Sequence, residues 1–77
     1  MIKDKIKALI TITGHSQAEI SDIKKVSRQQ YNLKINRGAF RIDDLIELAD
    51  LTGTTLAFND QETGKPLIEF DVSDIQK

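Results

Sequence analysis

The chain has 77 residues, enough for one small domain that buries a smaller fraction of its surface than an average domain does. It contains no cysteine, which excludes a disulfide framework, a thiolate nucleophile and a cysteine-based zinc site. Its longest purely apolar run, residues 8–10, is far too short to cross a bilayer, and the lysine-rich start lacks the features of a signal peptide. We therefore expect a cytoplasmic protein whose small core gains from dimerisation.

The charge is distributed unevenly along the chain, although the net charge is only −1. Residues 1–41 carry nine Lys or Arg against three Asp or Glu, a balance of +6. Residues 42–77 carry two Lys against nine acidic residues, a balance of −7. The first part attracts polyanions and the second repels them. Uneven charge also arises by chance in small domains, so the pattern alone leaves the partner open.

Two amphipathic helices are predicted at the start of the chain. Apolar residues recur every three or four positions over residues 2–13, which indicates a helix with lysines on its outer face, and Gly14 ends it. Ser16 and Glu19 have the spacing of a Ser-x-x-Glu capping box, so a second helix begins after Ser16 and runs over residues 17–24. Its apolar stripe consists of Ala18, Ile20 and Ile23.

A third helix is predicted over residues 27–36, with the hydroxyl of Ser27 as its cap. Tyr31 and Ile35 lie one turn apart and join Val26 on the core side. The opposite side carries polar side chains that can hydrogen-bond to bases or phosphates, together with one apolar residue that can contact a thymine methyl group. These residues are Gln29, Asn32, Leu33 and Asn36. Taken alone, they are also typical of an ordinary solvated helix face.

After a loop in which Phe40 is expected to turn inward, the sequence predicts a fourth helix that ends at Gly53. Asp43 and Asp44 suit the positive end of its dipole. Its expected inner face consists of Ile42, Leu45, Ile46 and Ala49.

The apolar period then changes to two, which predicts strands at residues 54–58 and 67–72 joined by a turn with Asp, Gly and Pro. One face of this hairpin carries Leu56, Phe58, Ile68, Phe70 and Val72. A lone two-stranded hairpin is marginal in water, so this face is expected to pack on the helices, on a second copy of the chain, or on both. Residues 73–77 are predicted to be a short polar tail.

Two motifs lie ten residues apart at the starts of the second and third predicted helices. They are Gln17-Ala18-Glu19-Ile20 and Ser27-Arg28-Gln29, followed by the exit Asn36-Arg37-Gly38. With these motifs, residues 2–53 resemble the Cro/cI-type helix-turn-helix family, also called the XRE family. The sequence departs from the family pattern at Ser21, Lys24 and Lys25.

The resemblance implies a mainly α fold. Residues 1–53 would form a four-helix, lambda-repressor-like helix-turn-helix bundle, with a C-terminal β-hairpin and tail at residues 54–77. In some small phage Cro proteins C-terminal strands form the dimer, and by analogy this hairpin is expected to do so through Leu56, Phe58, Ile68, Phe70 and Val72.

The resemblance also implies roles in DNA binding, with the second helix across the DNA backbone and the third in the major groove. Arg28 can fork onto guanine O6 and N7, and Gln29 can pair with adenine N6 and N7. The expected base-reading residues are Arg28, Gln29, Asn32 and Leu33. The expected backbone contacts come from Ser16, Gln17, Lys24, Lys25, Ser27, Lys34, Asn36 and Arg37.

The leading hypothesis is a homodimeric, sequence-specific transcription regulator of the phage or bacterial Cro/cI type, acting as a repressor. Its partner would be double-stranded DNA with a near-palindromic operator, because a dimer places two recognition helices about one DNA turn apart. The alternative is a protein-interaction module or antitoxin-like regulator that binds a different protein through the acidic hairpin.

An enzyme is the third class, and the sequence offers it little support. It contains no nucleophile–base set, no metal-ligand cluster and no glycine-rich phosphate loop. His15 lies in a polar turn with no second His or Cys to join it at a metal. We therefore expect no catalytic residue, metal, cofactor or small-molecule substrate.

Overall fold

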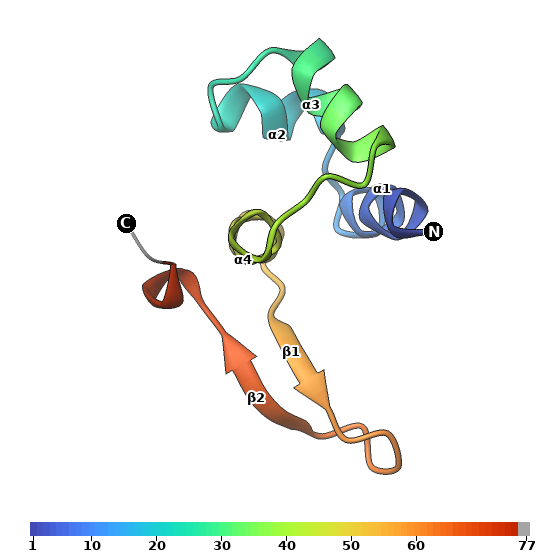
Figure 1. The fold of residues 1–77 in the computed structure, drawn as a ribbon, viewed down its shortest axis with the longest axis vertical. Helices are drawn as coiled ribbons and strands as arrows, with labels where there is room; N and C mark the ends of the chain where they lie inside the picture. Colours follow the sequence, from blue (N-terminus) through green and yellow to red (C-terminus); the bar gives the residue numbers. More distant parts are fainter. Residues whose placement is uncertain (76–77) are drawn as a thin grey trace. The chain divides into compact units, whose positions relative to one another are not determined.

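The structure is a computed structural model that describes residues 1–75. In this part the protein is mainly helical, with four α-helices and a small two-stranded antiparallel sheet (Figure 1). None of these helices combines the length and the apolar character needed to cross a bilayer. Residues 76 and 77, the end of the predicted polar tail, lie outside the described residues.

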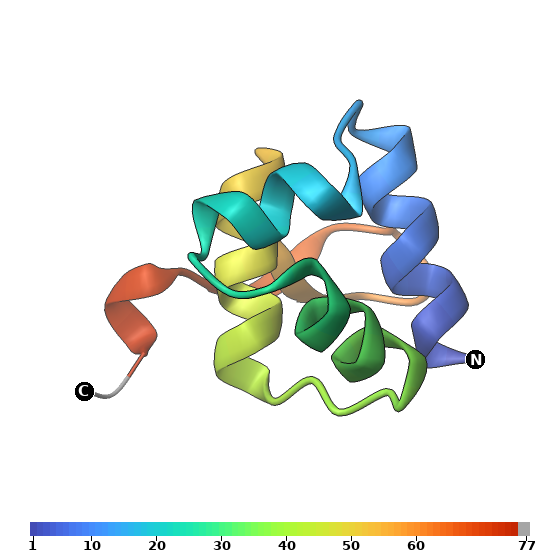
Figure 2. The same cartoon turned by 90° about the horizontal axis from the view of Figure 1, so that it is seen from above.

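The contacts divide the chain into two compact units, Met1–Phe40 and Arg41–Lys77. The N-terminal unit contains helices α1 (Ile2–Ile12), α2 (Gln17–Ile23) and α3 (Arg28–Asn36), as the sequence predicts. Both α1 and α2 pack on α3, and Figure 2 shows α2 beside α3 with the short turn that joins them. The predicted domain boundary after residue 53 stays a prediction.

The core of the N-terminal unit contains apolar residues from all three helices. They are Ile6, Ile10, Ile20, Tyr31 and Ile35. The two residues from α1 lie four positions apart, as do the two from α3, which places each pair on one side of its helix. This is why an amphipathic sequence folds into packed helices. The predicted core positions Tyr31 and Ile35 are confirmed.

Two apolar residues predicted for this core are instead exposed. Ile23 is 53% exposed and Val26 is 38% exposed. Each residue turns an α-helix by about 100°, and the buried side of α2 lies at Ile20 and Ser21, so Ile23 projects away from it. Val26 lies in the turn after α2, outside both helices.

The C-terminal unit begins with α4 (Ile42–Thr52), which starts and ends where the sequence predicts. The carboxylate of Asp44 accepts the backbone N–H of Arg41 at 2.9 Å, so the expected acidic helix start is confirmed. Ile42, which was expected on the inner face, is 52% exposed because the buried residues begin one turn later. The buried residues of α4 are Ile46, Leu48, Ala49 and Thr52, and Leu48 was not predicted.

The hairpin consists of β1 (Leu56–Asn59) and β2 (Pro66–Phe70), which pair antiparallel. Leu56 lies opposite Phe70 and Phe58 lies opposite Ile68, so these four residues share one face as predicted. The first strand begins two residues later than expected because the N–H of Thr54 donates to Ala49 O at the end of α4.

The fifth residue predicted for that face, Val72, is not in a strand. It begins a short 3-10 helix, η1 (Val72–Asp74), in place of the predicted strand end and polar tail. The carboxylate of Asp71 accepts the N–H of Ser73 at 2.8 Å, and the N–H of Asp71 donates to the carboxylate of Asp74 at 2.9 Å. This pair of bonds caps η1 and ends the ladder at Phe70.

Candidate nucleic-acid interface

Two serine caps fix the starts of α2 and α3. Ser16 Oγ accepts the N–H of Glu19 at 3.1 Å, and Ser27 Oγ accepts the N–H of Gln30 at 3.0 Å. Both predicted caps are therefore confirmed. The carboxylate of Glu19 lies 2.5 Å from His15 Nδ1, so it pairs with the preceding turn and does not complete the capping box.

The turn between α2 and α3 depends on an unusual backbone conformation at Lys25. Its φ is +58°, and it is the only non-glycine residue with positive φ in the part of the chain that the structure describes. The N–H of Val26 donates to Ser21 O at 3.0 Å and the N–H of Lys25 donates to Asp22 O at 3.2 Å, which closes the end of α2. This left-handed position favours glycine, so Lys25 strains the turn while bringing a cation beside α3.

The inner side of α3 anchors the helix. Ile35 is fully buried, and the ring of Tyr31 lies 5.9 Å from that of Phe40, centroid to centroid. Phe40 is half-buried, so the expected inward turn is confirmed in part. The amine of Lys34 lies 5.5 Å from the centre of the same ring, which orients its charge along the side of α3.

Every predicted base-reading residue of α3 is exposed: three lie around the side opposite the core, and Arg28 is the first residue of the helix. Arg28, Gln29, Asn32 and Leu33 are all exposed, and Leu33 is 44% exposed among polar neighbours. Tyr31 and Ile35 fix this helix in the core, and its exposed side chains can present hydrogen-bond donors, acceptors and one apolar contact to a groove.

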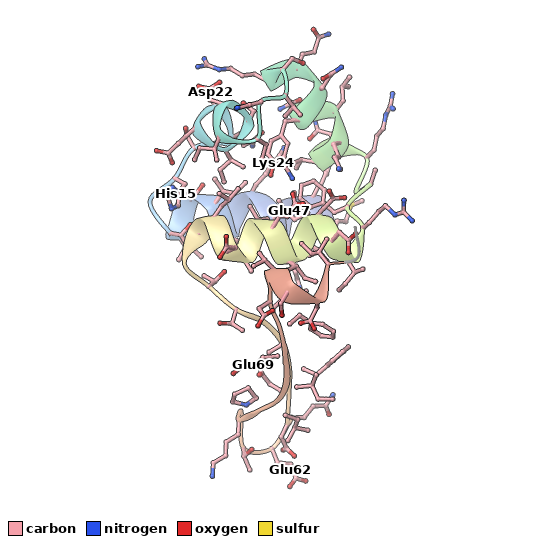
Figure 3. The ribbon with its side chains drawn as sticks, turned by 90° about the vertical axis from the view of Figure 1, so that its left-hand side faces the viewer. His15, Asp22, Lys24, Glu47, Glu62 and Glu69 are labelled. Atoms are coloured by element: carbon pink, nitrogen blue, oxygen red, sulfur yellow. The ribbon has the colours of Figure 1, made fainter. Side chains whose placement is uncertain are left out.

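The predicted backbone-contact residues surround that helix within the N-terminal unit. Ser27 is its cap, Lys34 and Asn36 lie in its last turn, and Arg37 follows it. Gln17 opens α2, whereas Lys24 and Lys25 form the turn (Figure 3 labels Lys24). The exposed members of this set are Ser16, Lys25, Ser27, Asn36 and Arg37. The half-buried members are Gln17, Lys24 and Lys34. The arrangement supplies several cations within the half of the chain whose charge balance is positive.

A chain of three amides links the start of α2 to α3. Asn32 Nδ2 donates to Gln17 Oε1 at 3.3 Å, and Asn36 Nδ2 donates to Asn32 Oδ1 at 2.9 Å. Gln17 uses only its carbonyl oxygen in this chain, which leaves its N–H groups for a ligand. The bonds hold Asn32 in one orientation on the exposed face, and the sequence pattern did not predict them.

Arg28 is also in contact with α2. Its Nη2 lies 3.1 Å from Asp22 Oδ2, and both side chains are largely exposed (Figure 3 labels Asp22 on α2). Sequence reasoning missed Asp22. The available signal was an acidic residue six positions before Arg28 in a strongly basic half of the chain.

The predicted dimerisation residues gather on the hairpin, with Val72 just beyond it in η1. Leu56 and Phe70 are half-buried, whereas Phe58 is 67% exposed and Ile68 is 60% exposed. The rings of Phe58 and Phe70 lie 5.8 Å apart in an edge-on arrangement. The opposite face carries Leu67, which is as exposed as Phe58. Leu67 was not among the predicted dimerisation residues.

Acidic side chains occupy the loops of the same unit. Asp60 accepts the N–H groups of Thr63 and Glu62, and these bonds hold the pKa of its carboxyl below the ordinary value of 3.8. Hydrogen bonds from Ser73 lower the pKa of Asp71 in the same way. Glu62 and Glu69 lie along the hairpin in Figure 3. Within residues 1–75, no group of three or more His, Cys, Asp or Glu side chains is arranged to hold a metal ion.

Comparisons of the chain with protein-family models, with curated proteins and with solved structures found no match. The candidate interface at α2 and α3 must therefore be interpreted from its own geometry and chemistry.

Proposed function

We propose that the protein is a sequence-specific DNA-binding transcription regulator that places α3 in the major groove and acts as a homodimer. The observation that carries the proposal is that α3 is anchored by two buried side chains and exposes four side chains that can contact bases. Tyr31 and Ile35 are buried, while Arg28, Gln29, Asn32 and Leu33 are exposed on one fixed helix. The major groove, about 12 Å wide, admits an α-helix that carries such side chains.

The chemistry of the exposed side suits the edges of base pairs. Arg28 offers a donor fork to guanine, Gln29 offers a donor and an acceptor to adenine, and Leu33 offers an apolar contact to a thymine methyl group. Asn32 lies one turn beyond Arg28, and its bonds to Gln17 and Asn36 restrict its orientation. A restricted side chain loses less freedom on binding, which supports a reading role.

The surroundings of α3 suit the DNA backbone. Gln17 at the start of α2 and Ser16 before it lie where a helix end attracts phosphate. Lys24, Lys25, Lys34 and Arg37 would add attraction that is independent of sequence and weakens with salt. In this proposal α2 and α3 form the helix-turn-helix of a lambda-repressor-like arrangement, and the regulator acts as a repressor.

The homodimer is proposed from the exposed apolar face of the hairpin. Phe58 and Ile68 leave large apolar surfaces in water, and a two-stranded hairpin is marginal without further packing. A second copy that covers this face would hold two α3 helices for two half-sites. The operator would then be near-palindromic, with half-sites about one DNA turn apart.

Selection of duplexes from a random pool tests this function and identifies the operator in one experiment. We expect enrichment of a near-palindromic sequence and a steep loss of affinity as salt rises. Arg28→Ala and Gln29→Ala should each weaken binding to the selected duplex about tenfold, because a bidentate base contact carries about 1–3 kcal/mol of discrimination.

Two variants in the hairpin turn provide matched controls. Lys65→Ala removes a cation and Gln61→Ala removes an amide, both from exposed positions outside the N-terminal unit. Neither should change binding to the selected duplex. The proposal is wrong if no sequence is enriched, or if Arg28→Ala and Gln29→Ala bind the selected duplex as well as the parent does.

A second candidate function is a protein-interaction module, in which the hairpin binds a different protein. The exposed apolar residues Phe58, Leu67 and Ile68 favour it, because exposed apolar surface is typical of protein-binding sites. They also lie in the acidic half of the chain, which repels DNA. Sedimentation separates the candidates. A strict monomer that changes its sedimentation only with a foreign protein would favour the interaction module, whereas a dimer formed by the chain alone favours the regulator.

A further inference from the structure

The acidic residue Asp22 lies at an end of α2 where the helix dipole does not favour a negative charge. Residues 1–41 contain three acidic side chains, Asp4, Glu19 and Asp22. Asp4 and Glu19 lie in the first turns of α1 and α2, where the helix dipole favours negative charge. Asp22 lies at the other end of α2, one residue before it ends, where the dipole disfavours a carboxylate.

The contact that Asp22 makes is with the leading base-reading residue. Its Oδ2 lies 3.1 Å from Nη2 of Arg28, with 60% of the Asp22 side chain and 69% of the Arg28 side chain exposed. An ion pair as exposed as this one adds little to folding stability. The position of Asp22 is therefore better explained by what it does to Arg28 than by what it does for the fold.

The pair leaves Arg28 able to read a base. A guanidinium has five N–H donors in a rigid plane, and Asp22 engages one nitrogen at one edge. The remaining donors include a fork that fits guanine O6 and N7. A guanidinium held at one edge samples fewer orientations, so it can form this fork with a smaller loss of freedom and can reach fewer alternative acceptors.

The same carboxylate opposes binding that is independent of sequence. A negative charge close to the DNA backbone repels phosphates, and it also offsets part of the attraction that Arg28 would otherwise exert on them. Removal of this charge should strengthen binding to any duplex while it releases Arg28 from its orientation.

We propose that Asp22 is a positioning residue that restricts Arg28 to a guanine contact and lowers affinity for unrelated DNA. This inference rests on the proposed DNA-binding function and assigns the origin of its specificity. It also names the class of operator, one with a guanine in the major groove opposite the first turn of α3 in each half-site.

The test compares Asp22→Asn with the parent on two duplexes of equal length, the selected operator and an unrelated sequence, at one salt concentration. The variant should bind the unrelated duplex more tightly, and the ratio of the two affinities should fall about fivefold, the upper range for an exposed ion pair. Asp22→Glu, which keeps the carboxylate, should restore part of the ratio.

Two further variants separate positioning from charge alone. Asp4→Asn removes the same charge from an exposed site in α1 and should leave the ratio unchanged. In an Arg28→Ala background, Asp22→Asn should no longer change the ratio, because its effect passes through Arg28. Replacement of the contacted guanine by 7-deazaguanine removes N7 and should weaken parent binding more than Asp22→Asn binding.

The outcomes distinguish this inference from the function on which it rests. If the parent prefers the selected duplex but Asp22→Asn discriminates equally well, the positioning role is wrong and the proposed function stands. The same conclusion follows if Asp22→Asn changes the ratio equally with and without Arg28. If the parent binds both duplexes alike, both the proposed function and this inference are wrong.

Discussion

The α2–α3 region and the hairpin differ in how far their apolar side chains are buried. In the first, Ile20, Tyr31 and Ile35 are buried in the core. Ile23, Val26 and Leu33 are exposed among polar neighbours. In the second, Phe58 and Ile68 are exposed although they share a face with Leu56 and Phe70. The three helices of the N-terminal unit bury part of their apolar stripes against one another. The two short strands of the hairpin leave Phe58 and Ile68 uncovered on their apolar face. The first region presents a largely polar surface over a buried core, and the second presents an exposed apolar face.

The largest expected effect on stability comes from removing a side chain by which α3 packs in the core. Ile35→Ala should lower the free energy of unfolding by about 2–5 kcal/mol, because it removes buried methyl groups and leaves a cavity. Denaturant unfolding followed by circular dichroism measures the change. Ile12→Ala is the matched control, since Ile12 is 82% exposed and its loss should change stability by less than about 0.5 kcal/mol. Equal effects for the two variants would contradict the burial of Ile35 in the core.

The next effect concerns the apolar face of the hairpin. Phe58→Ser should weaken self-association about tenfold or more, because the proposed dimer buries a large aromatic side chain at this position. Sedimentation equilibrium over a range of concentrations measures the dimer constant. Ile12→Ser makes a comparable change to an exposed apolar residue in the N-terminal unit and should leave the constant unchanged. An unchanged constant for Phe58→Ser would remove the hairpin from the dimer interface.

A smaller effect, of opposite sign, is expected at the turn between α2 and α3. Lys25→Gly should raise the free energy of unfolding by about 0.5–1 kcal/mol, because glycine adopts positive φ without the clash of a side chain. The same variant should weaken DNA binding at low salt, since it removes a proposed phosphate contact. Lys5→Gly, in the exposed middle of α1, should instead lower stability by about 1 kcal/mol. Thermal unfolding of both variants tests the contrast, and a loss of stability at both positions would contradict the strain at Lys25.

The smallest effect is a pH dependence of the hairpin turn. The pKa of Asp60 is lowered in the folded state by the N–H groups of Thr63 and Glu62, so the charged carboxylate stabilises the turn. This stabilisation is complete above the ordinary pKa of 3.8 and is lost as the pH falls through the lower folded-state pKa. Amide resonances of Glu62 and Thr63 followed by NMR between neutral and strongly acidic pH measure the transition. In Asp60→Asn it should disappear, whereas its persistence would assign it to another group.

The sequence predicted the elements of this protein well because local chemistry sets them. The caps Ser16 and Ser27 and the apolar spacing of Tyr31 and Ile35 act within one helix, and the structure confirms all four. The exposed positions of Gln29, Asn32 and Leu33 follow from the same spacing, whereas Arg28 lies three positions before Tyr31 and is exposed as the first residue of α3. The role of all four residues in reading DNA stays a proposal.

Contacts between elements were harder to predict. Asp22 meets Arg28, and Gln17 meets Asn32, only because the left-handed turn at Lys25 sets how α3 follows α2, and spacing along the chain does not encode that angle. Residues at element ends were also misjudged. Ile42 and Val72 have the right apolar character, but the buried face of α4 and the ladder of the hairpin do not extend to them.

NMR of the isotope-labelled protein titrated with the selected duplex shows whether the exposed residues of α3 bind DNA. We expect the largest amide shift changes at residues 16–17 and 27–37, and we expect them to weaken as salt is added. Much smaller changes are expected in residues 56–70. Shift changes confined to the hairpin, with α3 unaffected, would contradict this expectation and favour the interaction module.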